Sequence, residues 1–71
     1  MSKYHSLWDY ILLKNQESLT LTFFEIHTIT GFELDHSFLS YKKELLQYGF
    51  CVSKISMKEK KVIFNKLKDT D

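Results

Sequence analysis

The four residues 22–25, Thr-Phe-Phe-Glu, constrain the fold of this chain more than any other feature. A threonine followed three positions later by glutamate is a capping box: the threonine side chain caps a helix, and the glutamate reaches back to the threonine N–H. Residues 18–22, directly before it, alternate between polar and apolar side chains and predict a short strand. Gly31 then ends the helix in the left-handed conformation that glycine adopts easily. We expect a strand that runs without a loop into a helix over residues 23–30.

Two further helices are predicted on either side of this unit. The first covers residues 3–14, with Ser2 as its N-cap. Its apolar face is Tyr4, Leu7, Trp8 and Ile11. The other is capped by Asp35 or Ser37 and reaches about residue 48, since Gly49 ends it. One side of this third helix is apolar, at Phe38, Tyr41, Leu45 and Tyr48, and the opposite side carries a polar stripe of His36, Ser40, Lys43 and Gln47.

The C-terminal third predicts a β-hairpin. Its strands are residues 50–57 and 61–67, and residues 58–60, Lys-Glu-Lys, form the turn. Val52 and Ile55 are an odd number of positions apart, so both face the core only if a β-bulge or a strong twist separates them. The periodicity of all these elements gives one predicted core, made of Leu7, Trp8, Ile11, Phe23, Ile26, Ile29, Leu45, Val62 and Phe64.

The predicted order is α-β-α-α-β-β, an α+β class with three helices and a small antiparallel sheet. A chain of 71 residues has room for one domain, so we expect residues 1–71 to form it, with a frayed tail at 68–71. The order is similar to that of winged-helix domains. Residues 41–52 resemble the end of a winged-helix recognition helix that runs through Gly49 into the wing. The resemblance implies that the third helix is presented to a partner and that the hairpin forms the wing.

The chain also resembles a family of small, uncharacterised bacterial proteins. The stretches that carry this resemblance cover most of residues 3–64: Lys3-Tyr4-x-x-Leu7-x-x-Tyr10-Ile11, Leu19-Thr20-Leu21-Thr22-Phe23-x-Glu25-Ile26-x-x-Ile29-x-Gly31, and Gly49-Phe50-x-Val52-x-x-Ile55 with Val62-x-Phe64. Many members have a longer central segment with paired tryptophans. This chain lacks that segment, since its one tryptophan is Trp8. The resemblance implies a bacterial origin and no particular reaction.

Charge is unevenly distributed along the chain. Residues 1–35 hold two lysines and five acidic residues, a net charge of −3, whereas residues 36–71 hold eight lysines and four acidic residues, a net charge of +4. Such an asymmetry can mark a basic face for nucleic acid or for an acidic protein. Charge alone favours the other interpretation, in which the lysines solvate a hairpin edge and protect it from aggregation. All ten basic residues are lysine. The lack of arginine weighs against bidentate reading of guanine.

The chemistry-bearing residues predict no enzyme. His5, His27, His36 and Cys51 are not at metal-ligand spacings, so no metal site, no cofactor and no Cys–His nucleophile is expected. Two glycines cannot form a phosphate-binding loop, and nothing points to a small-molecule substrate. The sequence begins without a signal peptide and has no long apolar run, so we expect a cytoplasmic protein outside the membrane.

Two functions remain open. In the first, duplex DNA binds the polar stripe and the wing, through His36, Ser40, Lys42, Lys43, Gln47, Lys58, Lys60 and Lys61. In the second, the domain is a protein-interaction module or a small phage-type effector or adaptor. It then binds a protein partner or a second copy, and Phe24 and Leu13 are the contacts. Phe24 points away from the inner face of its helix; it is either a tolerated lone phenylalanine or a partner contact. Glu44 and Glu59 distinguish the two functions, because acids placed among the lysines would interrupt a basic face.

Overall fold

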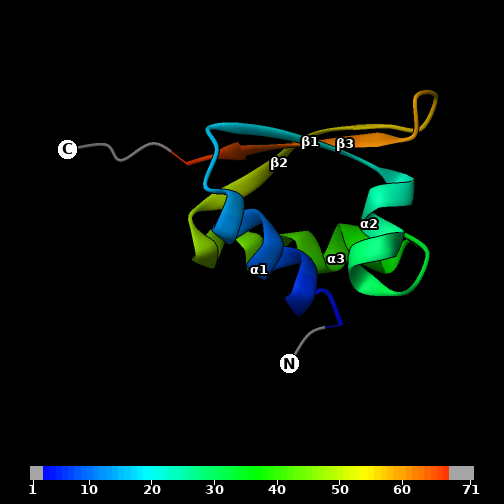
Figure 1. Ribbon diagram of the computed structural model, residues 1–71, viewed down its shortest axis with the longest axis horizontal. Helices are drawn as coiled ribbons and strands as arrows, with labels where there is room; N and C mark the ends of the chain where they lie inside the picture. Colours follow the sequence, from blue (N-terminus) through cyan, green and yellow to red (C-terminus); the bar gives the residue numbers. More distant parts are fainter. Residues whose placement is uncertain (1–2, 68–71) are drawn as a thin grey trace.

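The computed structural model describes residues 3–67, and its elements follow the predicted order α-β-α-α-β-β. They are α1 (His5–Lys14), β1 (Ser18–Thr22), α2 (Phe23–Thr30), α3 (Ser37–Tyr41), the 3₁₀ helix η1 (Lys42–Tyr48), β2 (Phe50–Ser56) and β3 (Lys61–Lys66). Figure 1 shows two layers: the sheet lies on one side, and the helices gather on the other. Within residues 3–67, no helix combines the length and apolar character needed to cross a membrane.

The local signals around residue 22 are confirmed. The Thr22 side chain accepts a hydrogen bond from the backbone N–H of Glu25 at 3.0 Å, and Glu25 accepts one from the N–H of Thr22 at 2.8 Å. Gly31 ends α2 with φ +86°, and Gly49 ends η1 with φ +89°. These residues fix the helix ends through hydrogen bonds and backbone angles of their own.

The sheet has the strand order β1-β3-β2, and both pairings are antiparallel. The central strand β3 places Val62 opposite both Leu21 and Ile55, and Phe64 opposite both Leu19 and Val52. The predicted bulge is present, since the register of β2 shifts between Val52 and Lys54. The extra residue brings Val52 and Ile55 to the same face of the sheet, opposite the two buried side chains of β3.

One buried cluster lies between the sheet and the helices. Seven of the nine predicted core residues are fully buried: Leu7, Trp8, Ile11, Ile26, Leu45, Val62 and Phe64. Phe23 and Ile29 are only half-buried, although they pack against this cluster. The cluster also contains Tyr4, Leu21, Phe38 and Phe50. Tyr4 and Phe38 meet edge to face with ring centroids 5.5 Å apart, an arrangement that aromatic pairs favour.

Three sequence-based predictions about the helices need correction. The first helix begins at His5, with Tyr4 as an N-cap that makes no side-chain capping bond. Ser2, the expected cap, and the tail at 68–71 lie outside the described residues. The third helix is α-helical for only five residues, and its predicted second half is the 3₁₀ helix η1. The residue at its N-cap position is His36, although Asp35 does accept a hydrogen bond from the N–H of Ser37 at 2.9 Å.

Candidate functional site: an apolar groove between the third helix and the hairpin

A hollow with a mainly apolar lining lies where α2, α3 and the end of β2 meet. It holds about 570 Å³, within the range of about 300–1,000 Å³ typical of ligand pockets. Asp35 and His36 are its polar lining residues. Its apolar lining is Phe23, Leu34, Phe38, Leu39, Ile55 and Met57. We call this hollow the α2–α3–β2 groove.

Local structure explains why these apolar side chains remain uncovered. Phe23 is the first residue of α2, directly after the capping threonine, so it lies at the end of the helix and not along its buried face. Ile55 reaches the groove because the bulge in β2 keeps it on the same side as Val52. Met57 follows the last residue of β2 and enters the turn. Leu39 stands one position after the buried Phe38, about 100° around α3.

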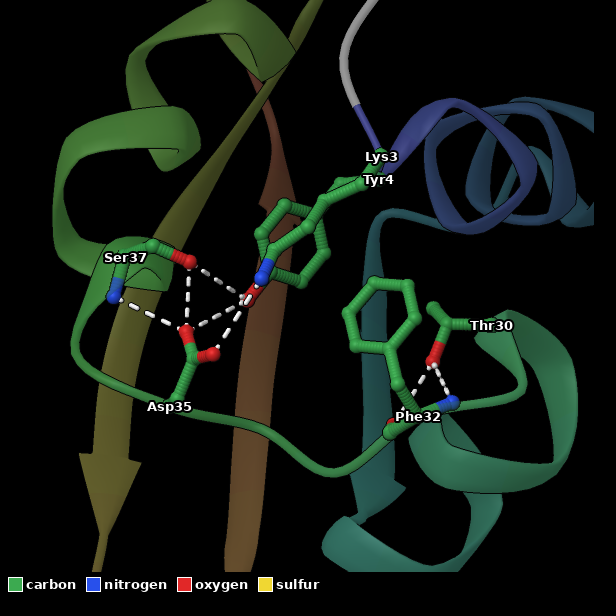
Figure 2. A network of polar contacts seen from close by, with 6 residues as sticks. All are labelled: Lys3, Tyr4, Thr30, Phe32, Asp35 and Ser37. Atoms are coloured by element: carbon green, nitrogen blue, oxygen red, sulfur yellow. Dashed lines mark hydrogen bonds and ion pairs between the residues drawn. The ribbon is translucent and has the colours of Figure 1, made fainter.

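The loop between α2 and α3 forms one wall of the groove, and a polar network holds it in place (Figure 2). Lys3 contacts the Asp35 carboxylate at 3.1 Å, and the Ser37 hydroxyl donates a short hydrogen bond to the same carboxylate. Hydrogen bonds from Ser37 and the positive charge of Lys3 lower the pKa of Asp35 to about 2. On the other side of the loop, the Thr30 hydroxyl donates to the carbonyl oxygen of Phe32 at 2.9 Å. The wall is therefore held at both of its ends.

Large apolar side chains project into solvent around the groove. Phe24 is 77% exposed, Met57 is 74% exposed and Leu39 is 51% exposed. Phe24 lies in a second hollow that shares Phe23 and Leu34 with the groove. Contiguous exposed apolar side chains of this kind mark interaction sites, whereas isolated ones are ordinary.

Leu13 is not part of this surface. It is 83% exposed on α1 and lines a separate shallow hollow with Asp9, Leu12 and Asn15. The two predicted partner contacts, Phe24 and Leu13, are thus on different hollows. Only Phe24 adjoins the groove.

The residues predicted to bind nucleic acid are distributed over three segments. The exposed ones are His36 directly before α3, Ser40 in α3, and Lys43 and Gln47 in η1. Lys58 and Lys60 are exposed in the hairpin turn. Lys42 and Lys61 are half-buried. Between the start of α3 and the hairpin turn lies the groove, since His36, Leu39 and Met57 all line it.

The 3₁₀ helix changes the predicted polar stripe. Four residues apart in an α-helix means about 40° apart around the axis, whereas in a 3₁₀ helix it means about 120°. Lys43 and Gln47 both lie in η1, so they no longer share one stripe. Leu46, three positions after Lys43, is 51% exposed on the same segment. The surface that would enter a DNA groove therefore carries leucine side chains among its polar ones.

The hairpin turn is attached to α2. The backbone N–H of Phe23 donates to the carbonyl oxygen of Lys60 at 2.8 Å, which satisfies one of the N–H groups that the first turn of a helix leaves without a partner. Glu59 pairs with Lys61 at 2.7 Å, and the hydrogen bond from Lys61 lowers the pKa of Glu59. Glu44, in contrast, accepts a hydrogen bond from Trp8. Only one of the two acids in question therefore engages a lysine of the basic face.

The histidines and the cysteine lie on different elements. His5 contacts Asp9 at 3.0 Å on α1, His27 is on α2, His36 precedes α3, and the half-buried Cys51 is in β2. Among residues 3–67, no three histidine, cysteine, aspartate or glutamate side chains gather closely enough to hold a metal ion.

Comparison of the chain with family models, with curated proteins and with solved structures finds no match. The resemblance to a small bacterial family stays a prediction. The groove itself must indicate the function.

Sequence reasoning identified Phe24 but missed the other exposed members of this surface, Leu39 and Met57. The available signal was position on the helix: Leu39 falls outside the apolar side formed by Phe38, Tyr41 and Leu45. Met57 continues the alternation of Ile55 past the end of the strand. Neither signal says that the two side chains meet, because that depends on how α3 packs beside the hairpin.

Proposed function

We propose that this chain is a protein-binding module that takes up apolar side chains of a partner in the α2–α3–β2 groove. The observation that carries the proposal is the exposure of Leu39, Met57 and Phe24 around one hollow with an apolar lining. Burying such side chains against a partner removes them from water, which is the main favourable term in protein association. Interfaces for DNA are much more positively charged and more polar than this surface.

Binding of duplex DNA is the second function, and the exposure of Lys43, Lys58 and Lys60 favours it. Lysines can hold phosphates without reading sequence. Three observations reduce the support for this function. The 3₁₀ form of η1 breaks the predicted polar stripe, leucines are exposed on the same surface, and Glu59 pairs with Lys61.

A selection from a phage-displayed library of random peptides separates the two. We expect the wild-type protein to enrich peptides that contain large apolar residues. A variant with Leu39→Ser and Met57→Ser should lose these peptides. Leu46→Ser is the matched control, because Leu46 has the same 51% exposure on the neighbouring segment but does not line the groove.

Enrichment of no peptide, or of peptides that bind the groove variant equally well, would contradict the proposal. Fluorescence anisotropy with a labelled mixed-sequence duplex is the parallel measurement. Electrostatic binding is strongest at low salt, so the titration is made at low and at physiological ionic strength. Duplex binding that depends on Lys58 and Lys60, in the absence of any groove-dependent peptide, would establish the second function instead.

A further inference from the structure

The groove continues toward the hairpin turn. The second hollow shares Phe23 and Leu34 with the groove and extends past the first turn of α2. Its other lining residues are Phe24, His27, Glu33 and Lys60. A bound segment that fills the groove with apolar side chains therefore meets polar and charged groups when it passes into this second hollow.

The charge at this end is positive. Lys58 and Lys60 are exposed in the turn. Neither lysine forms an ion pair within the described part of the chain, residues 3–67. Glu59 lies between them in sequence, but its carboxylate contacts Lys61 at 2.7 Å. The turn thus offers two lysine ammonium groups, while its own carboxylate is already engaged.

The acidic groups that line the two hollows do not balance these lysines. Asp35 is held by Lys3 at 3.1 Å and by hydrogen bonds from Ser37. Glu33 is exposed and is the other carboxylate of the lining. Of the charged side chains that line the two hollows, Lys60 and Glu33 have no ion pair within residues 3–67. Lys58 follows the lining residue Met57 in sequence and adds a second lysine charge in the turn.

From this charge pattern we propose that the partner segment is acidic: large apolar side chains enter the α2–α3–β2 groove, and adjacent carboxylates face Lys58 and Lys60. The inference rests on the proposed protein-binding function and adds the chemistry of the partner. Complementary charge beside an apolar contact speeds association and rejects partners of the wrong sign. It accounts for lysines at the edge of an apolar surface without any nucleic acid.

Two displayed libraries measure the charge preference. Both vary apolar positions among leucine, isoleucine, methionine and phenylalanine. The remaining positions carry glutamate with neutral residues in one library, and lysine with the same neutral residues in the other. We expect binders that require Leu39 and Met57 to come from the acidic library. If neither library yields such binders, the proposed function itself fails. If the basic library yields them as readily, only the acidic partner is ruled out.

Charge reversal at the turn provides a second measurement on the same peptides. Lys58→Glu combined with Lys60→Glu should weaken binding of acidic peptides about tenfold at low salt, the scale of two exposed ion pairs lost and replaced by repulsion. The matched control combines Lys43→Glu with Lys66→Glu, which changes net charge equally away from the groove. Lys66 lies opposite Phe50, at the other end of the hairpin from the turn. Equal weakening by both double variants would overturn the proposed contact with Lys58 and Lys60.

A second copy of the chain is the remaining occupant, and its signature differs. Leu12 and Leu13 are exposed beside Asp9 on α1. In a dimer, these two side chains of one copy would enter the groove of the other. Sedimentation equilibrium should show a monomer if the partner is a different, acidic protein segment. Self-association that both Leu13→Ser and Leu39→Ser abolish would overturn the proposal in favour of the second copy.

Discussion

The indole Nε1 of Trp8 donates a hydrogen bond to Oε1 of Glu44 over 3.1 Å, and this bond joins α1 to η1 across 36 positions of sequence. The side chain of Trp8 is 1% exposed, so its N–H has little access to water. A buried donor that loses its acceptor costs free energy because water cannot replace the bond. The contact also directs the carboxylate of Glu44 toward α1.

Removal of this acceptor should destabilise the fold. We expect Glu44→Ala to lower the free energy of unfolding by about 1–3 kcal/mol, the cost of an unsatisfied buried donor. Glu44→Gln should lose less, because the amide oxygen can still accept from the indole. Urea unfolding followed by tryptophan fluorescence measures both variants. Equal stability of the alanine variant and the wild type would mean that the hydrogen bond contributes nothing.

The buried sheet residue Phe64 tests the position of the core. Phe64 is fully buried on the central strand, between Leu19 and Val52 on its two neighbours. Phe64→Ala should lower the free energy of unfolding by about 3–5 kcal/mol, since it leaves a cavity as well as removing apolar burial. Leu13→Ala, at an exposed position of α1, should change it by less than about 0.5 kcal/mol. Thermal unfolding by circular dichroism compares the two, and an unchanged melting temperature for Phe64→Ala would contradict the described packing.

Substitution of Gly49 should destabilise the fold only through the backbone conformation at this position. It ends η1 with φ +89°, and an added Cβ would meet no heavy atom within 4 Å. Gly49→Ala therefore introduces no clash with neighbours, but it places a side chain in the left-handed region, at a cost of about 1–2 kcal/mol. Gly49→Asn should cost less, because asparagine tolerates this region better. Chemical denaturation gives the order glycine, asparagine, alanine from most to least stable; a different order would exclude backbone conformation as the cause.

Acid should remove the contribution of Asp35. Its pKa is lowered from 3.8 to about 2 in the folded chain, first by the Ser37 side-chain hydrogen bond and then by Lys3. A lowered pKa means that ionised Asp35 stabilises the fold above about pH 4, and that this contribution is lost as the pH falls toward 2. The stability difference between wild type and Asp35→Asn should therefore shrink over this range.

Glu33→Gln is the reference for this experiment, because it removes an exposed carboxylate in the same loop without touching the Lys3–Asp35–Ser37 contacts. Urea unfolding at a series of pH values gives both differences. Titration of this carboxyl falls between pH 5 and 2. If the difference in the free energy of unfolding between the wild type and Asp35→Asn stays constant over this range, ionised Asp35 does not stabilise the fold.

How far the sequence predicted the candidate site depends on the residue. Phe24 was identified because its angle on the helix wheel needs only the periodicity of α2. Leu39 and Met57 were not, because their importance depends on contact between two segments, and the two residues are 18 positions apart in sequence. Phe23 is the opposite case. The helical periodicity of α2 predicts that it is buried, but it lines the groove and is only half-buried.

Elements with local signals could be predicted from the amino-acid pattern. The capping box at Thr22, the helix ends at Gly31 and Gly49, and the bulge after Val52 all depend on hydrogen bonds, backbone angles or alternation within a few residues. The form of residues 42–48 and the groove depend on long-range packing. The α and 3₁₀ forms of residues 42–48 differ little in local pattern, and the groove exists only where α2, α3 and β2 leave apolar side chains uncovered. Exposure is set by neighbours distant in sequence, so periodicity alone could not locate it.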